Sequence, residues 1–132
     1  MSTELFYLTL TALLAASLWI PYIVGVNSTE VPAMAENRPH DVADLVPWVH
    51  RAYRAHLNLL EQFLPFAVLV LIGQSAGITS PALGVLAAVF FALRLAHAYW
   101  MIAGHKVLPW RPVIFSAGWG VILAYAVILL WA

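Results

Sequence analysis

Residues 5–26 read LFYLTLTALLAASLWIPYIVGV and carry no charged side chain. A helix rises about 1.5 Å per residue, so this run is long enough to cross a hydrocarbon core of about 30 Å. A cleaved signal peptide has a basic start and a shorter apolar stretch, whereas this chain opens Met1-Ser2-Thr3-Glu4. We therefore expect residues 5–26 to form a membrane span that the mature protein keeps.

Three further apolar stretches, at about residues 48–73, 82–104 and 112–131, also have the length of a membrane span. The composition agrees with them, because 64% of the residues are hydrophobic and only 9% are charged, whereas a soluble domain has about 25% charged residues. Only short connections remain between the spans, so we expect no second globular domain. The sequence predicts an all-α integral membrane protein, with residues 1–132 forming one bundle of four transmembrane helices.

The composition also excludes several kinds of function. The chain contains no cysteine, and so has no disulfide, no thiolate metal site and no thiol nucleophile of its own. We expect no metal site. Six basic side chains balance six acidic ones, so no net positive field attracts nucleic acid. Any sulfur chemistry needs a thiol from outside the protein.

The basic side chains other than Arg94 indicate how the chain is oriented. They all fall in or beside the loops that join the first span to the second and the third to the fourth: Arg38, Arg51, Arg54, Lys106 and Arg111. Loops rich in Lys and Arg tend to face the cytoplasm. We therefore expect these two loops to be cytoplasmic and both termini to lie in the opposite compartment.

The second span begins with a polar stripe. At about 100° per residue, its members fall within an arc of about 80° on one helix face: Arg51, Arg54, Asn58, Glu61 and Pro65. Glu61 lies about two turns deeper than Arg54, where an isolated carboxylate costs several kcal/mol or becomes protonated. We therefore expect Glu61 to pair with a cation, either Arg54 or Arg94.

A second polar pair lies on the third span. Arg94 and His97 are one helical turn apart and therefore share a face at bilayer depth. One interpretation is a structural ion-pair network that sets how the helices pack. The other is a site for a polar ligand, with the same side chains as its wall, because ionisable groups inside a membrane usually face a bundle interior or a polar cavity.

These residues together resemble a known family. Residues 54–65 read Arg-Ala-His-x-Asn-x-x-Glu-x-x-x-Pro, preceded by Arg51 and followed by Arg94-x-x-His97 and a basic turn. The pattern resembles the MAPEG family, the membrane-associated proteins in eicosanoid and glutathione metabolism, in its short bacterial-type form. The number of spans and the positions of the loops match as well, so the resemblance covers nearly the whole chain.

The resemblance implies a homotrimer that binds glutathione between neighbouring subunits, near the cytoplasmic side, and presents its thiol to lipophilic substrates. It implies glutathione contacts for a set of polar residues: Arg51, Arg54, His56, Asn58, Glu61, Arg94 and His97. By the same resemblance the catalytic arginine is Arg111, with Lys106 as the alternative. A guanidinium beside a thiol favours the thiolate, which is the nucleophile.

The sequence departs from the characterised enzymes of that family at three positions. Leu57 stands where the prostaglandin-synthase branch has an arginine, Met101 where a tyrosine is usual, and Pro112 where that branch has a serine. The hypothesis that the resemblance implies is a glutathione-dependent transferase or peroxidase acting on lipophilic electrophiles or lipid hydroperoxides. The alternatives are a non-catalytic protein, whose polar stripe stabilises a trimer or binds a lipid headgroup or small thiol, and a small transporter subunit.

Overall fold

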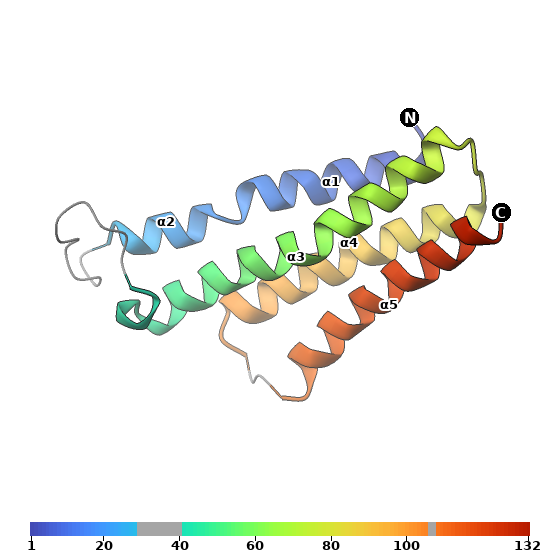
Figure 1. The fold of residues 1–132 in the computed structure, drawn as a ribbon. Coiled ribbons are helices and arrows are strands. Elements are labelled where there is room, and N and C mark those ends of the chain that lie inside the picture. Colours follow the sequence, from blue (N-terminus) through green and yellow to red (C-terminus); the bar gives the residue numbers. More distant parts are fainter. Residues whose placement is uncertain (29–40, 106–107) are drawn as a thin grey trace.

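The computed structural model describes residues 1–28, 41–105 and 108–132, and these residues are helical apart from short turns (Figure 1). The elements are α1 (Thr3–Ser17), α2 (Ile20–Val26), the short 3-10 helix η1 (Val42–Asp44), α3 (Pro47–Ser75), α4 (Pro81–Ile102) and α5 (Trp110–Leu130). In these ranges four helical segments are long and apolar enough to cross a membrane, with α1 and α2 counted as one segment, Thr3–Val26. The predicted all-α fold with four spans is confirmed.

The first span contains a break that the apolar pattern does not predict. Helix α1 ends at Ser17, and α2 begins at Ile20 with Pro21 in its first turn. Proline has no amide hydrogen, so Pro21 cannot donate to the carbonyl of Ser17, and its ring crowds the preceding turn. The amide of Leu18 still donates to the carbonyl of Leu14 across 2.9 Å. The chain therefore bends between the two helices and continues along the bundle.

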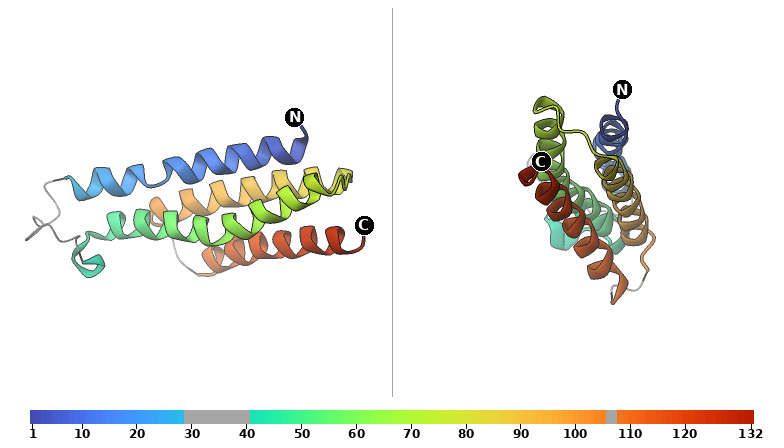
Figure 2. Two further views of the ribbon diagram at one scale, coloured as in Figure 1. Left: turned by 45° about the horizontal axis from the view of Figure 1, so that its top comes forward. Right: turned by 90° about the vertical axis from the view of Figure 1, so that its right-hand side faces the viewer.

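Helix α4 lies at the centre of the bundle. It packs against α1, α3 and α5, whereas α2 contacts α3. Consecutive spans run in opposite directions, and both termini lie at the same end as the turn between α3 and α4 (Figures 1 and 2). The long helices lie side by side in both views of Figure 2. Polar side chains of α3, α4 and α5 can therefore meet where they lie at the same level along the bundle.

Two larger apolar clusters form most of the described core, and a small third one, Leu45 and Val49, lies where α2 meets α3. The one nearer the termini joins α3, α4 and α5 through these buried side chains: Phe66, Val70, Leu83, Ala87, Phe90, Val121, Ile122 and Tyr125. Its centre is the stacked pair Phe66 and Phe90, whose ring centroids are 3.9 Å apart. The other cluster joins α1, α3 and α4, and its buried members are Ala15, Leu18, Ala55, Leu59, Ala98 and Met101.

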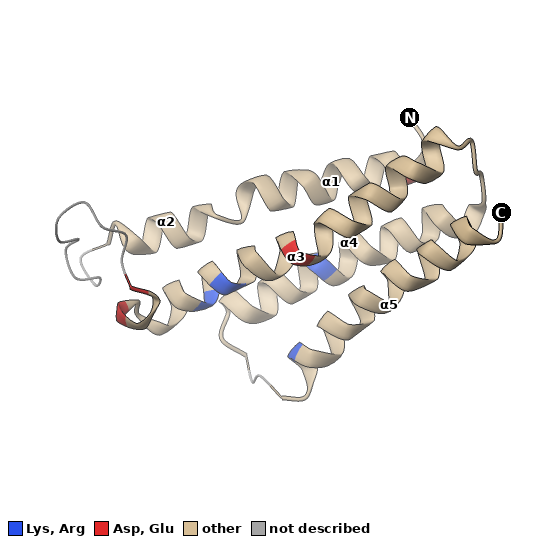
Figure 3. Ribbon diagram, viewed as in Figure 1, with Lys and Arg blue, Asp and Glu red and all other residues tan. Residues whose placement is uncertain are grey.

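A layer of buried polar side chains separates the two clusters. It consists of Asn58 and Gln62 from α3 and Arg94 and His97 from α4. The basic positions of the described chain lie in this middle layer and toward the end opposite the termini (Figure 3). Because polar groups inside a membrane protein normally face protein or a polar cavity, this layer is the natural place to look for a site.

Candidate functional site

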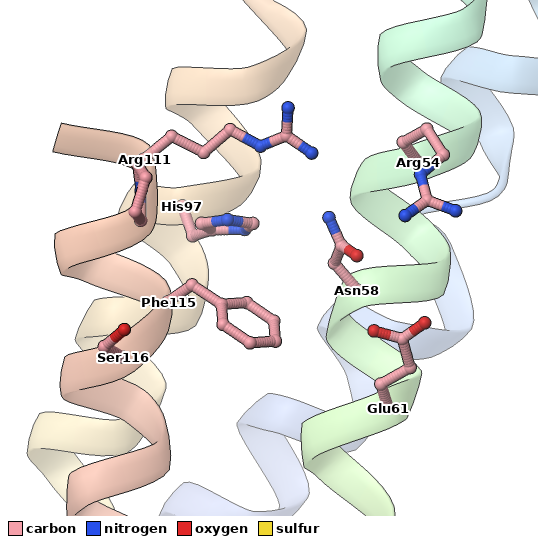
Figure 4. Close-up of a pocket in the computed structure, with 8 residues that line it drawn as sticks. Arg54, Asn58, Glu61, His97, Arg111, Phe115 and Ser116 are labelled. Carbon is pink, nitrogen blue, oxygen red and sulfur yellow. The ribbon is translucent and has the colours of Figure 1, made fainter. Parts of the chain in front are cut away.

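A cavity of about 500 Å³ opens between α3, α4 and α5 at the level of the polar layer. Helix α3 contributes Arg54, Asn58 and Glu61 to its wall, α4 contributes His97, and α5 contributes Arg111, Pro112, Phe115 and Ser116. In Figure 4 the side chains of Arg111, His97 and Phe115 point across the cavity toward those of α3. The structure thus brings residues from three separate helices together around one cavity.

The α3 wall carries three different polar groups in a row. Arg54, Asn58 and Glu61 follow one another at intervals of about one turn, so their side chains project from the same face of the helix (Figure 4). Asn58 is only 6% exposed, and its Nδ2 donates to the sulfur of Met101 at 3.4 Å. A cation, an amide and a carboxylate therefore face the cavity in that order along α3.

The opposite wall comes from α4 and α5. The His97 ring is 2% exposed, and its centroid lies 5.8 Å from that of Phe115. Among the described residues, nothing forms a hydrogen bond with the buried Nε2 of His97. Arg111 is the second residue of α5 and lies beside the free amides at the start of that helix, which carry a partial positive charge. This wall therefore offers positive charge and a buried imidazole to a ligand.

Among the described residues, Glu61 does not form the ion pair that its depth predicts. Within the described ranges, no basic side chain lies within the 4.0 Å of its carboxylate that an ion pair requires. Arg54 is about two turns away, roughly 10 Å along the helix, and Arg94 instead donates from Nη2 to the carbonyl of Ile114 at 3.1 Å. The Glu61 side chain is exposed beside the cavity, so its carboxylate is available to another partner.

The family model that matches this sequence is that of the MAPEG family, and it covers residues 5–131. The chain belongs to the MAPEG family. The resemblance carried by the α3 motif is thereby confirmed. No curated protein matches the chain in sequence. MAPEG membership and the four apolar helices make the chain an integral, multi-pass membrane protein of a family associated with glutathione and eicosanoid metabolism.

Five residues singled out by the MAPEG pattern line the cavity together: Arg54, Asn58, Glu61, His97 and Arg111. Arg94 lies behind the wall, 1% exposed, with its guanidinium carbon 5.8 Å from the Phe90 ring centroid and 5.6 Å from that of Phe115. In the single chain, Arg94 therefore packs against Phe90 of α4 and Phe115 of α5 and does not line the cavity.

Arg51 and His56 also lie off the cavity wall in the single chain. Arg51 packs on the turn after α4, where a Cβ placed on Gly104 would lie 2.8 Å from the guanidinium. Gly104 has φ 76°, a backbone conformation that favours glycine. His56 is partly buried on α3. The alternative cation of the MAPEG pattern, Lys106, lies outside the described residues.

Three residues near the site are not part of the MAPEG pattern as read from the sequence. Phe115 and Ser116 lie one turn after Arg111 and line the cavity, so helical spacing from Arg111 is the signal that points to them. Gln62 directly follows Glu61, is 5% exposed and donates from Nε2 to the carbonyl of Phe115 at 3.0 Å. In the described part of the chain, no group of His, Asp and Glu residues has the arrangement of a metal site.

Proposed function

We propose that this MAPEG protein is a membrane-embedded, glutathione-dependent transferase or peroxidase that acts on lipophilic electrophiles or lipid hydroperoxides. The observation that carries the proposal is the cavity itself. It joins Arg54, Asn58 and Glu61 of α3 to Arg111 at the start of α5. Its volume of about 500 Å³ falls within the range of about 300–1,000 Å³ that is typical of small-molecule sites.

The polar groups of the wall fit the chemistry of glutathione. The tripeptide carries two carboxylates, one ammonium, peptide groups and a thiol. Arg54 suits a carboxylate, since guanidinium and carboxylate form charge-assisted hydrogen bonds, and the unpaired Glu61 suits the ammonium. Asn58 and the buried Nε2 of His97 suit the peptide groups, because each has an atom able to exchange a hydrogen bond with an amide.

Bound glutathione would supply a thiol nucleophile toward an electrophilic carbon or a hydroperoxide oxygen. In this proposal Arg111 is the catalytic residue. Its guanidinium and the positive end of α5 both favour a thiolate over a thiol, and so raise the fraction of nucleophile at neutral pH. The low polarity of a membrane strengthens this electrostatic effect, because apolar surroundings screen charge less than water does.

The apolar part of the wall supports a lipophilic second substrate. Pro112 and Phe115 line the cavity. The α5 face that they begin continues one turn later with Trp119, which is 56% exposed. On α3 the position one turn after Glu61 is Leu64, which is 69% exposed. In a multi-pass membrane protein, apolar side chains that are exposed on a single chain face lipid or a neighbouring subunit, so a substrate dissolved in the bilayer can approach the cavity along this apolar surface.

The proposal includes a homotrimer with the cavity near the cytoplasmic side. The MAPEG match and the clustering of Arg51, Arg54 and Arg111 toward one end of the bundle support this arrangement. Residues that lie off the cavity in one chain, His56 among them, then become candidates for contact with a neighbouring subunit's glutathione. Crosslinking in native membranes tests the trimer, and labelling of residues in the two basic loops tests the orientation.

A direct test uses the purified protein in detergent. We expect calorimetry to detect glutathione binding, and we expect turnover of 1-chloro-2,4-dinitrobenzene or cumene hydroperoxide with glutathione. S-methylglutathione is the matched control, since it keeps the polar ends of the ligand and lacks the nucleophile. Glutathione binding without turnover of either substrate would contradict the catalytic proposal, and absence of binding would contradict the site as well.

A second candidate function is favoured by one observation. Glu61 has no ion pair within the described chain, so its carboxylate suits a basic group of a neighbouring subunit in a non-catalytic, trimer-stabilising network. That function predicts that Glu61→Gln dissociates the assembly in detergent, as measured by light scattering after size exclusion. An intact assembly that has lost glutathione affinity supports the enzyme instead.

A further inference from the structure

Behind the cavity, α3, α4 and α5 meet at a buried contact that the proposed chemistry does not use. Gln62 is 5% exposed and Arg94 is 1% exposed, and neither side chain lines the cavity. Both lie against Gly118 of α5, because a Cβ added there would stand 2.5 Å from Arg94 Nη2 and 2.6 Å from Gln62 Oε1. Two long polar side chains thus converge on one glycine.

Both side chains donate to the backbone of α5 at neighbouring residues. Arg94 Nη2 donates to the carbonyl of Ile114 at 3.1 Å, and Gln62 Nε2 donates to the carbonyl of Phe115 at 3.0 Å. A carbonyl oxygen has two lone pairs, so it accepts a side-chain donor in addition to its helical amide. The two bonds therefore tie the start of α5 to α3 and to α4 simultaneously.

The position of these bonds links them to the cavity wall. Ile114 and Phe115 lie about one turn after Arg111, and Phe115 is itself a wall residue. The Arg94 guanidinium carbon also lies 5.6 Å from the Phe115 ring centroid. A rotation or shift of α5 would therefore break both hydrogen bonds and move Arg111 and Phe115 together.

The membrane surroundings make these two hydrogen bonds more specific than apolar contacts between the helices. On lipid-facing surfaces of a bundle, apolar side chains pack against lipid as readily as against another helix, and so they restrict helix rotation weakly. A buried amide or guanidinium finds few other partners inside a membrane, since no bulk water competes for it. Gly118 provides the space for both groups, because any larger residue would meet them.

We propose that Gln62 and Arg94, packed on Gly118, are positioning residues that hold the first turns of α5 so that Arg111 and Phe115 face Asn58 and Glu61. The proposal rests on the proposed function for its kinetic consequence. Its structural content, a side-chain anchor on the carbonyls of Ile114 and Phe115, stands without any activity.

The variants Gln62→Met and Gly118→Ala test the anchor. The first keeps the side-chain length and removes the donor, and the second fills the space against which both groups lie. The chain offers matched controls. Gly120→Ala places its Cβ where nothing lies within 4 Å, and Gln74→Met makes the same exchange near the end of α3.

We expect kcat with 1-chloro-2,4-dinitrobenzene to fall about 10–100-fold in both test variants, because a misplacement of about 1 Å costs catalysis on that order. The Kd for glutathione should change less than about threefold, since the α3 wall that binds it is intact. The controls should match the parent. An unchanged kcat in Gln62→Met and Gly118→Ala overturns the proposal, and so does an equal loss of kcat and glutathione affinity.

Hydrogen exchange keeps the anchor testable if the parent protein has no turnover. We expect the amides of residues 113–119 to exchange about tenfold faster in Gln62→Met and Gly118→Ala than in the parent, and those of α1 to be unchanged. If the exchange of residues 113–119 equals that of the parent, the anchor does not exist, whatever the result for the proposed function.

Discussion

The side-chain amide of Asn58 donates a hydrogen bond to the sulfur of Met101 across 3.4 Å, from α3 to α4. Both side chains are buried, and Asn58 lines the cavity. A thioether is a weak acceptor, so this bond orients the amide while leaving its oxygen free for a ligand. Met101 thus acts on the cavity through Asn58, although it does not line the cavity itself.

The variant Met101→Leu tests that contact. The exchange conserves volume and removes the acceptor, so the bundle should remain stable while Asn58 loses its fixed orientation. We expect the Kd for glutathione to rise about two- to fivefold, since a neutral hydrogen bond contributes about 0.5–1.5 kcal/mol. Calorimetry measures the change, and Ile102→Leu is the control. Unchanged affinity would show that the sulfur contact does not matter for the ligand.

The variant Glu61→Gln tests the proposed ammonium contact. A charge-assisted hydrogen bond contributes about 1.5–3 kcal/mol, so we expect glutathione affinity to fall about tenfold or more. A glutathione analogue without its ammonium group should bind the parent and Glu61→Gln equally. If Glu61→Gln weakens binding of that analogue as much as it weakens binding of glutathione, then Glu61 does not contact the ammonium. Two groups that interact give a non-additive double-mutant cycle, and independent groups give an additive one.

The variant Arg111→Ala tests the catalytic assignment. We expect kcat to fall about a hundredfold, as is typical when one electrostatic contact to a developing anion is removed, and the Kd for glutathione to change little. Comparison of the two variants Arg111→Ala and Arg111→Lys separates charge from shape. A loss of binding equal to the loss of kcat would place Arg111 in recognition rather than in thiol activation.

The pH profile of the same variant gives an independent readout. In the proposed site, positive charge lowers the pKa of the glutathione thiol below the ordinary thiol value of about 8.5. Without Arg111 that pKa should rise, so the thiolate fraction falls most at neutral pH and recovers as the pH increases toward and above the ordinary value. Ultraviolet absorbance of the thiolate, titrated with parent and variant, measures this shift. Identical titrations would contradict the assignment.

The stacked pair Phe66 and Phe90 gives a prediction about stability alone. Both rings are fully buried, with centroids 3.9 Å apart and an interplanar angle of 18°. Phe66→Ala leaves a cavity, and in soluble cores such a change costs about 3–5 kcal/mol. We expect a lower thermal midpoint in detergent than for Phe6→Ala, whose ring is 46% exposed. Equal midpoints would mean that this cluster does not determine stability.

The sequence predicts the α3 side of the site because its information is local. Arg54, Asn58 and Glu61 share a face through helical periodicity alone, whatever packs against them. The position of Arg111 at the start of the last helix follows from the apolar run after it. The sequence also predicts that Glu61 pairs with Arg54 or Arg94. This prediction is wrong for the described chain, because Arg94 donates to the backbone of α5 and Arg54 lies about two helical turns from Glu61.

The apolar runs by themselves determined the four spans, since a chain in a bilayer must satisfy its backbone hydrogen bonds within helices. Helical spacing determined the polar stripe. Only the tertiary structure decided that Phe115 joins the wall and that Gln62 and Arg94 hold α5 against Gly118. These contacts depend on the rotation and depth of each helix relative to its neighbours. Most faces of every span are apolar, so the sequence pattern alone does not show how each helix is rotated. In the folded bundle, a few buried polar side chains with few possible partners determine that rotation.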